Sequence, residues 1–452
     1  MSTPVAGTSS TLARTLGLRE LILIVIGSVI GSGIFIVPGE VLRQTGFQVG
    51  PALLVWLAGG VLSLLGALTY AELGGMVPEA GGLYVYLRDT FGRLPAFLYG
   101  WSMFFAISSG SVATLAVAAA GYLNQIVPLT PAMGKVASVA MVAVVGLVNA
   151  RGTRHGAMVQ NWATAIKVAA ILLMAVVLVS GGAGLRESDR AIMPPALDGA
   201  LVSGMGVAMI GVLWAYEGWQ YVTFSAGEAL DPQRTFPRGI VLGTTALIAV
   251  YLLANVAYLA ALGPEAAGRS NAVAADAVRA VLGPGAGTLI AGAIVISMFG
   301  AANGITLTAP RVYFAMARDG VFFQRLAEVH PRFGTPAIAV IASSVWAAVL
   351  ALSGTFEQLL TYVVFAGWIF YALGGISLFL YRRLRPDAAR PFRVPGYPWT
   401  PILFVLSAAA IVVNTLFAQP VQALLGLGVV LLGTPAYYLW RRKPRGRALN
   451  LR

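Results

Sequence analysis

The sequence contains no cysteine, only two histidines and few charged residues, since Asp, Glu, Lys and Arg together make up 10% of its 452 positions. The absence of cysteine excludes disulfide bonds, a thiol nucleophile and a covalent link to a partner chain. An enzyme that works within a membrane needs an acid, a base, a nucleophile or a metal set. Acidic residues are sparse in the apolar segments, and His155 and His330 fall in expected loops, so we exclude an intramembrane enzyme.

Apolar residues dominate instead: they make up 58% of the sequence, and the mean hydropathy is +0.81. Long apolar runs reach the ~17–25 residues that cross a bilayer as a helix, and the alternating segments of an outer-membrane barrel are absent. The sequence therefore predicts an all-α polytopic membrane protein. Twelve transmembrane helices are expected, at about 19–46, 50–76, 95–127, 133–150, 156–181, 201–229, 237–262, 285–318, 336–353, 357–381, 398–417 and 420–440.

The distribution of positive charge predicts the orientation. With both termini cytoplasmic, 23 of the 30 Lys and Arg residues lie on the cytoplasmic side and six on the other, which is the positive-inside pattern. The net charge of +13 then needs no nucleic-acid partner. We expect a multi-pass protein of the cell (inner or plasma) membrane. Its parts are a cytoplasmic N-terminal tail (1–18), a single membrane transport domain (19–440) and a basic cytoplasmic tail (441–452).

Two of the expected spans are interrupted near their middle. Gly31-Ser32-Gly33 interrupts the first span, and Glu217-Gly218 interrupts the sixth. Paired interruptions in two halves of a membrane protein point to an inverted-repeat transporter and to its binding site. We therefore expect a 5+5 inverted repeat with spans 1 and 6 broken, plus two additional spans. The expected boundaries are about 19–181 for repeat one, 201–381 for repeat two and 398–440 for the added spans.

A broken helix exposes main-chain N–H groups at the start of its second half and carbonyl groups at the end of its first half. These groups are costly in hydrocarbon unless they face a cavity, where they bind a carboxylate and an ammonium group respectively. A zwitterionic amino acid carries both groups, and small side chains at the break let it approach the backbone. Close helix packing through small residues is the alternative explanation of the glycines.

Several segments, in order along the chain, resemble the amino acid–polyamine–organocation (APC) superfamily. They are "IGSGIF" (30–35), "YAELGGMVPEAGGLYVYL" (70–87), "WAYEGWQYVTFSAGE" (214–228), "FPRGI" (236–240) and "FGAANGITLTAPRVYFAMARDG" (299–320). Together they look most like the L-type (LAT) branch, which holds the light subunits of heteromeric amino-acid transporters and their prokaryotic relatives. The resemblance implies a LeuT-like fold, sodium-independent transport and usually obligatory exchange of amino acids.

The resemblance also implies a substrate-binding site, with the residues Val29, Ser32, Gly33, Ile34, Trp214, Ala215, Glu217 and Tyr258. The N–H groups of Ser32 and Gly33 would hold the substrate carboxylate. The α-amino group would be received by four carbonyls, those of Val29, Trp214, Ala215 and Glu217. Trp214 matches the aromatic gate of the family, which is commonly a phenylalanine, and Tyr258 is a further lining candidate.

Partners other than amino acids and the lipid bilayer are not expected. Eukaryotic light subunits join a heavy chain through a cysteine in the loop after span three, and here that loop, "NQIVPLTPAMGK" (124–135), has none. We therefore expect no disulfide-linked heavy chain, and the missing cysteine argues for a prokaryotic source. No cofactor and no metal are expected.

Lys167 lies near the middle of the fifth span, where a charge is costly and marks a functional site by default. We expect its ammonium group to replace a metal ion and to join span five to spans one and eight, with Ser297 and Asn303 nearby. The resemblance supports this role, because relatives carry a lysine where sodium-coupled cousins bind Na⁺. The alternative is a lysine that snorkels to the interface. Proton coupling through Lys167 also stays open.

The side chain of Glu217 has three candidate roles: recognition of a cationic side chain, transfer of a coupling proton, or hydrogen bonding between helices. Glu72, at the end of span two, is expected to pair with a basic loop residue.

The preferred function is sodium-independent exchange of neutral L-amino acids by alternating access. The alternatives are a proton-coupled amino acid importer and an exchanger of cationic amino acids or polyamines. A channel would need a continuous ring of selectivity groups instead of paired breaks.

Overall fold

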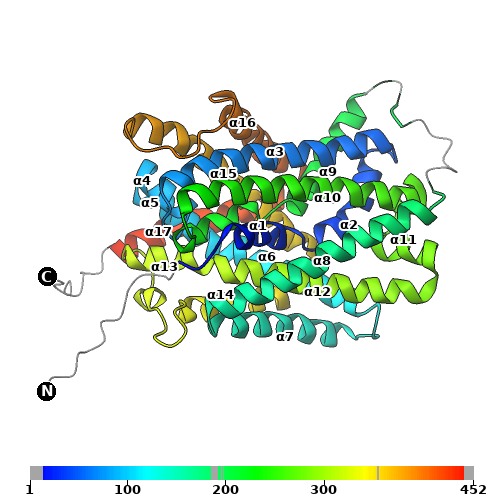
Figure 1. Ribbon diagram of the computed structural model, residues 1–452, viewed down its shortest axis with the longest axis horizontal. Coiled ribbons are helices and arrows are strands. Elements are labelled where there is room, and N and C mark those ends of the chain that lie inside the picture. Colours follow the sequence, from blue (N-terminus) through cyan, green and yellow to red (C-terminus); the bar gives the residue numbers. More distant parts are fainter. Residues whose placement is uncertain (1–13, 185–191, 195, 197, 354–355, 442–452) are drawn as a thin grey trace, which may run out of the picture.

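The computed structural model describes residues 14–184, 192–194, 196, 198–353 and 356–441. Within these ranges every named element is helical, apart from one isolated β-bridge between Leu16 and Ala229. The long helices run side by side along one axis, and their connections gather at the two ends of the bundle (Figure 1). The expected tails, 1–13 and 442–452, lie outside the described residues.

Among the described residues, ten helices are long and apolar enough to cross a membrane, or eleven with the bent pair α1 (Leu18–Val29) and α2 (Gly33–Gln44) counted as one span. The other spans of the first half are α3 (Val49–Met76), the continuous run α5 (Arg93–Ser102), η1 (Met103–Ile107) and α6 (Ser108–Leu123), then α7 (Pro131–Ala150) and α8 (Thr153–Gly181). Those of the second half are α9 (Gly199–Ala215) with η2 (Trp219–Glu228), α10 (Pro232–Arg269), α12 (Pro284–Thr308) with α13 (Pro310–Arg318), α15 (Phe356–Leu384), α16 (Trp399–Ala418) and α17 (Pro420–Arg441). The helix at the expected ninth span, α14 (Ala337–Ser353), has 17 residues, so the number twelve stays a prediction.

Both predicted interruptions are present. The first span bends by 47° between α1 and α2. The sixth span leaves the α-helix after Ala215 and continues from Trp219 as the 3₁₀ helix η2. Gly218, between the two parts, has a φ of 125°, which a residue with a Cβ rarely adopts. The glycine therefore permits the break in the sixth span.

The order of elements repeats in the two halves of the chain. In each half the broken span is followed by a long helix, then by a short one, α4 (Leu83–Phe91) or α11 (Val273–Leu282). The glycines that end the short helices, Gly92 and Gly283, have φ values of 90° and 89°. α4 and α11 lie at opposite ends of the bundle (Figure 1). Two repeats of opposite orientation would place them so, although their symmetry stays a prediction.

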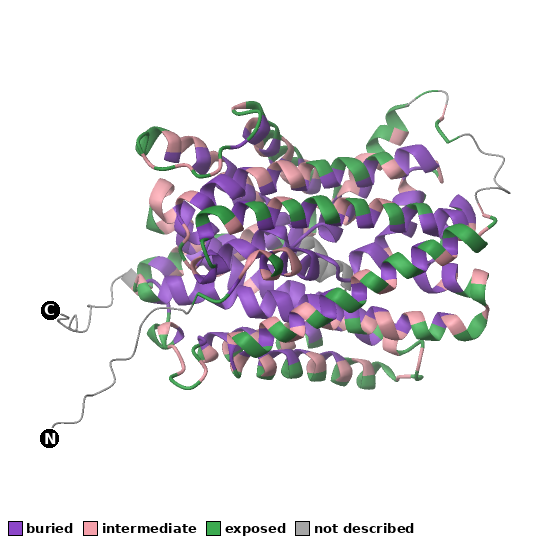
Figure 2. Ribbon diagram, viewed as in Figure 1, coloured by how far each residue is buried: buried purple, intermediate pink, exposed green. Residues whose placement is uncertain are grey.

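The buried residues lie around α1 and α6, and the outer helices, such as α7, alternate between buried and exposed positions (Figure 2). The exposed positions of the outer helices include large apolar side chains, for example Leu147 on α7, Leu173 on α8 and Leu406 on α16. Apolar side chains on the outside of a helix bundle are suited to contact lipid. The part of α1 that leads to the break, from Ile24 to Val29, is buried among other helices, whereas Arg19 near the start of α1 is exposed.

Two buried acidic residues hold the end of the bundle at which α4 lies. Glu72, on α3, accepts hydrogen bonds at 2.7 and 2.8 Å from Arg382, which lies in the last turn of α15 and not in a loop as expected. The loop residue Arg390 lies 3.8 Å from the same carboxylate. Glu228, at the end of η2, pairs with Arg311 of α13 at 2.8 Å, and their side chains are 2% and 1% exposed. The carbonyl of Glu228 also accepts from the main-chain N–H of Leu16, so the segment before α1 is attached there.

Candidate functional site

The two helix breaks lie against each other. A Cβ atom added to Gly33, at the start of α2, would stand 2.4 Å from the Cα atom of Ala215, at the end of α9. A Cβ atom added to Gly218 would stand 3.0 Å from the carbonyl oxygen of Ser28. The first distance is shorter than a side chain tolerates, and the second is tighter than most Cβ contacts, so these glycines let the backbones of the two broken spans lie close together.

The carbonyl ends of the two broken spans converge on one hydroxyl group. The Tyr251 hydroxyl, on α10, lies 3.1 Å from the Val29 carbonyl oxygen and 2.9 Å from that of Ala215 and can donate to either. Both carbonyls belong to the set expected to receive the α-amino group. Sequence analysis named Tyr258 on this helix, two turns further along. The Tyr258 hydroxyl is buried and has no hydrogen-bond partner among the described residues. Tyr251 therefore contacts the carbonyls at the breaks, and the role of Tyr258 at the substrate site stays a prediction.

The N–H end of the site is the start of α2. Because α2 begins at Gly33, the N–H groups of Gly33 and Ile34 belong to its first turn, where no intrahelical acceptor exists. The hydroxyl of Ser32, just before that turn, accepts a hydrogen bond from the indole N–H of Trp214 at 3.3 Å. The Trp214 side chain is therefore held against the start of α2 in this conformation.

A small cavity of about 20 Å³ lies between the breaks. Its lining residues are Ser28, Val29, Gly31, Ser32, Gly33, Ser111, Leu115, Trp214, Glu217 and Ile305. Five of the eight residues expected at the substrate site are among them, and Ile34, Ala215 and Tyr258 are not. A cavity of this size holds about one water molecule, so the structure is closed around the site and the helices must separate before a larger solute enters.

Four lining residues were missed by sequence analysis: Ser28, Ser111, Leu115 and Ile305. Ser28 directly precedes the first break, and its hydroxyl is buried without a hydrogen-bond partner among the described residues. A polar residue in the last turn before a break was a signal that could have identified it. Ser111, Leu115 and Ile305 come from α6 and α12, and nothing in their local sequence separates them from neighbouring apolar positions.

Lys167 is buried, and its ammonium group joins three helices. It donates hydrogen bonds to the carbonyls of Gly27 and Ile30, at 2.8 and 2.7 Å, and to the carbonyl of Ser297 at 3.2 Å. Gly27 lies near the end of α1 and Ile30 directly follows that helix, and Ser297 lies on α12. The Ser297 hydroxyl also reaches the Ile30 carbonyl, at 3.3 Å. The side chain therefore does not snorkel to the interface, and carbonyls surround it as they would surround a cation.

Asn303 does not belong with Lys167, and this corrects the expectation. Its amide group donates to the Gly156 carbonyl at 3.0 Å and to Gln160 at 3.1 Å, and it accepts from Asn149 at 2.8 Å. Asn303 follows Ser297 by six positions, which corresponds to about 9 Å along a helix. Asn303 therefore joins α12 to α7 and α8 at a different level of the bundle.

The side chain of Glu217 is hydrogen-bonded to neutral groups. One of its carboxylate oxygens accepts from the Tyr371 hydroxyl and from the Gln220 amide, both at 2.5 Å. The Gln220 amide also contacts the Tyr371 hydroxyl at 2.6 Å. Glu217 thus connects the break in the sixth span to α15, which is one of its three candidate roles. Gln220 and Tyr371 were missed, because no local pattern distinguishes Tyr371 from other tyrosines.

Comparison with known proteins gives matches over nearly the whole chain. The amino acid permease family matches residues 16–434. The b(0,+)-type amino acid transporter 1 of Rattus norvegicus is 33% identical over 441 residues, which cover 96% of this chain and 89% of that protein. The serine/threonine exchanger SteT of Bacillus subtilis (strain 168) is 31% identical over 435 residues, with 96% and 98% covered. The cystine/glutamate transporter of Homo sapiens is 33% identical over 443 residues, with 96% and 87% covered.

Proposed function

The chain belongs to the amino acid permease family, in its L-type branch, and on that basis we propose that it is a sodium-independent exchanger of neutral L-amino acids. Its relatives include an exchanger named for serine and threonine, a transporter named for cystine and glutamate, and a b(0,+)-type amino acid transporter. The chain would work by alternating access across the cell membrane, with both termini in the cytoplasm. Because it has no cysteine, it would work without a disulfide-linked heavy chain.

One observation carries the proposal: the two helix breaks meet, and they bring main-chain N–H groups and main-chain carbonyls close to one small cavity. The first turn of α2 presents N–H groups, and the Val29 and Ala215 carbonyls meet at the Tyr251 hydroxyl. N–H groups attract a carboxylate, and carbonyls attract an ammonium group. In the proposed complex the α-amino group would donate hydrogen bonds to the carbonyls at the breaks, and Trp214 would cover the solute.

Sodium independence is supported by the contacts of Lys167. Its ammonium group already supplies a positive charge to the carbonyls of Gly27, Ile30 and Ser297. A sodium ion would need the same kind of oxygen ligands. With a covalently attached cation at this junction, α1 would be held against α8 and α12 without a coupling ion.

A second candidate function, exchange of cationic amino acids, is favoured by Glu217. Its carboxylate lines the cavity, and both of its hydrogen-bond donors are neutral. A cationic substrate side chain would supply the missing positive charge. Neutral exchange remains the primary proposal, because the two donors already satisfy one oxygen of the carboxylate without a cation.

Counterflow into proteoliposomes tests the proposal. Vesicles that contain the purified protein would be loaded with unlabelled serine and placed in labelled serine, alanine, leucine or arginine, with choline in place of sodium. We expect uptake of labelled serine and alanine that requires an internal amino acid and is unchanged when sodium is restored. Protein-free vesicles give the background.

Three results would contradict the proposal. Uptake into empty vesicles driven only by a pH gradient would identify a proton-coupled importer. Faster counterflow of arginine than of alanine or serine would identify the cationic exchanger. Uptake that depends on sodium would refute the assigned role of Lys167.

A further inference from the structure

We propose that Ile305 is a specificity-determining residue, which limits the substrates to amino acids with short side chains such as alanine and serine. The inference rests on the proposed function, because it concerns the same cavity. It follows from the lining of the central cavity, from a second cavity on the other side of Ile305 and from the contacts that fix α12 in place.

The walls of the central cavity have two kinds of lining. The helix breaks supply main-chain groups for the carboxylate and the α-amino group. The other helices supply Ser111 and Leu115 from α6 and Ile305 from α12, so a substrate side chain that points away from the two breaks would face these three residues. Leu115 and Ile305 are 3% exposed. Two large apolar side chains thus close the end of the compartment that the substrate side chain would enter.

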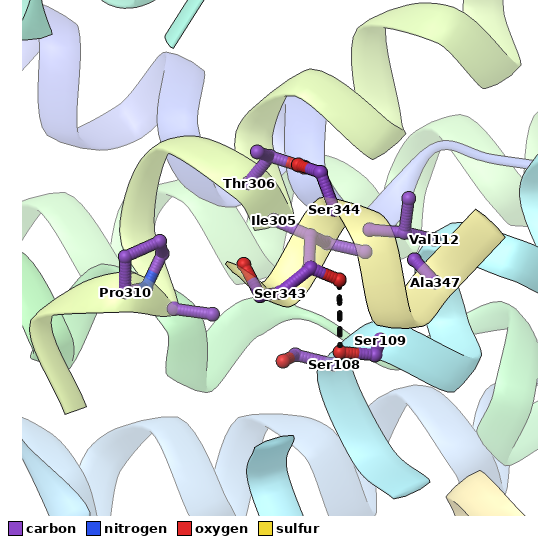
Figure 3. A pocket seen from close by; sticks show the side chains of 10 residues that line it. Ser108, Ser109, Val112, Ile305, Thr306, Pro310, Ser343, Ser344 and Ala347 are labelled. Atoms are coloured by element: carbon purple, nitrogen blue, oxygen red, sulfur yellow. Dashed lines mark hydrogen bonds between the residues drawn. The ribbon is translucent and has the colours of Figure 1, made fainter. Parts of the chain in front are cut away.

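A second cavity of about 10 Å³ lies between α6, α12 and α14, and Ile305 lines this cavity as well. Figure 3 shows Ile305 among the hydroxyl-bearing residues Ser108, Ser109, Thr306, Ser343 and Ser344. The Ser109 hydroxyl donates to the main-chain carbonyl of Ser343 at 3.4 Å (Figure 3). The Ile305 side chain is therefore a partition between the central cavity and a neighbouring space lined by hydroxyl groups.

Hydrogen bonds before and after Ile305 hold this partition in place. Asn303 is bonded to α7 and α8, and Arg311 is paired with Glu228. Gly304 brings α12 close to α1, because a Cβ atom there would stand 2.6 Å from the Ser28 hydroxyl oxygen. The wall cannot move away from a longer substrate side chain without breaking these contacts.

Removal of the partition would join the two cavities. An alanine at position 305 would leave the substrate side chain facing Thr306, Ser343 and Ser344. Thr306 and Ser343 are buried, and the Ser343 hydroxyl, which donates to the Val340 carbonyl, can still accept a hydrogen bond. A substrate amide could therefore bond to this wall, whereas an apolar side chain could not. The enlarged site would therefore accept glutamine more readily than leucine, although the two side chains have similar lengths.

Counterflow in proteoliposomes with labelled serine, glutamine and leucine tests this inference. The measured quantity is the ratio of kcat/KM for glutamine to that for serine. We expect the unsubstituted protein to favour serine. Ile305→Ala should raise the ratio of glutamine to serine by about tenfold or more, because one methylene group in an apolar pocket already changes kcat/KM by about that factor. The ratio of leucine to serine should rise less. Ile296→Ala is the matched control, because Ile296 lies on the same helix and is 47% exposed, and it should leave both ratios unchanged.

Two further variants keep the test decisive. Ile305→Phe should lower the transport of serine relative to that of glycine. If Ile305→Ala does not fold, Ile305→Val takes its place and should also raise the ratio of glutamine to serine, by a smaller factor. Equal glutamine ratios in the Ile305 variants and the Ile296→Ala control would overturn the inference and leave the proposed function intact. Equal transport of glutamine and serine by the unsubstituted protein would do the same. Absence of counterflow with every amino acid would refute the proposed function and the inference together.

Discussion

Replacement of Lys167 by alanine should strongly reduce transport while the protein stays folded. The substitution removes one ammonium group and leaves the carbonyls of Gly27 and Ile30 without that donor. These carbonyls belong to the end of α1, which borders the substrate cavity. We therefore expect α1 to lose its attachment to α8 at the level of the cavity.

The magnitude follows from the number of contacts. A hydrogen bond to a charged group contributes about 1.5–3 kcal/mol, and three are lost. The cost of burying the ammonium group, several kcal/mol, offsets much of their sum. A remaining loss of about 2–3 kcal/mol in the positioning of α1 corresponds to a roughly 30- to 150-fold lower rate.

Counterflow of serine measures the rate, and size-exclusion elution with circular dichroism measures folding. Lys167→Met separates charge from packing, because it keeps a long unbranched side chain, and it should be as slow as Lys167→Ala. Lys135, which is exposed, provides the matched control, and Lys135→Ala should keep the unsubstituted rate. Rates within twofold of the unsubstituted protein in Lys167→Ala would refute the role of this residue as a replacement for an ion.

Three other residues or pairs give clear expectations. Tyr251→Phe removes the hydroxyl that contacts both carbonyls at the breaks, and the loss of one neutral hydrogen bond, about 1 kcal/mol, should lower counterflow by roughly fivefold; an unchanged rate would contradict this. Glu217→Gln keeps an acceptor for Tyr371, so exchange of serine should persist within about twofold, whereas a complete loss would favour a role of the carboxylate in charge or proton transfer. Glu228→Gln leaves Arg311 buried without its charged partner and should destabilise the protein by about 3–5 kcal/mol, seen as a lower melting temperature. The double variant Glu228→Gln/Arg311→Met should recover part of that loss, and additive losses would argue against the pair.

The sequence by itself determined the class of the protein and the positions of its breaks. Apolar length predicts membrane helices, because each span must satisfy its own backbone hydrogen bonds within the bilayer. Residues that break a helix stand out within such a span, so Gly31-Ser32-Gly33 and Glu217-Gly218 could each be recognised as an interruption without knowledge of the other spans. Lys167 was also recognisable, because a charge in an apolar span is conspicuous without knowledge of its neighbours.

Only the tertiary structure decided which residues on different helices meet. Tyr251, which the sequence did not single out, contacts the carbonyls at the breaks. Asn303 joins α12 to α7 and α8 and does not lie beside the Lys167 ammonium group. These outcomes depend on the rotation of each helix about its own axis. Spans that are apolar on every side carry little periodic signal to fix that rotation. The role of Ile305 as a partition has the same origin, because a wall shared by two cavities exists only once three helices are packed together.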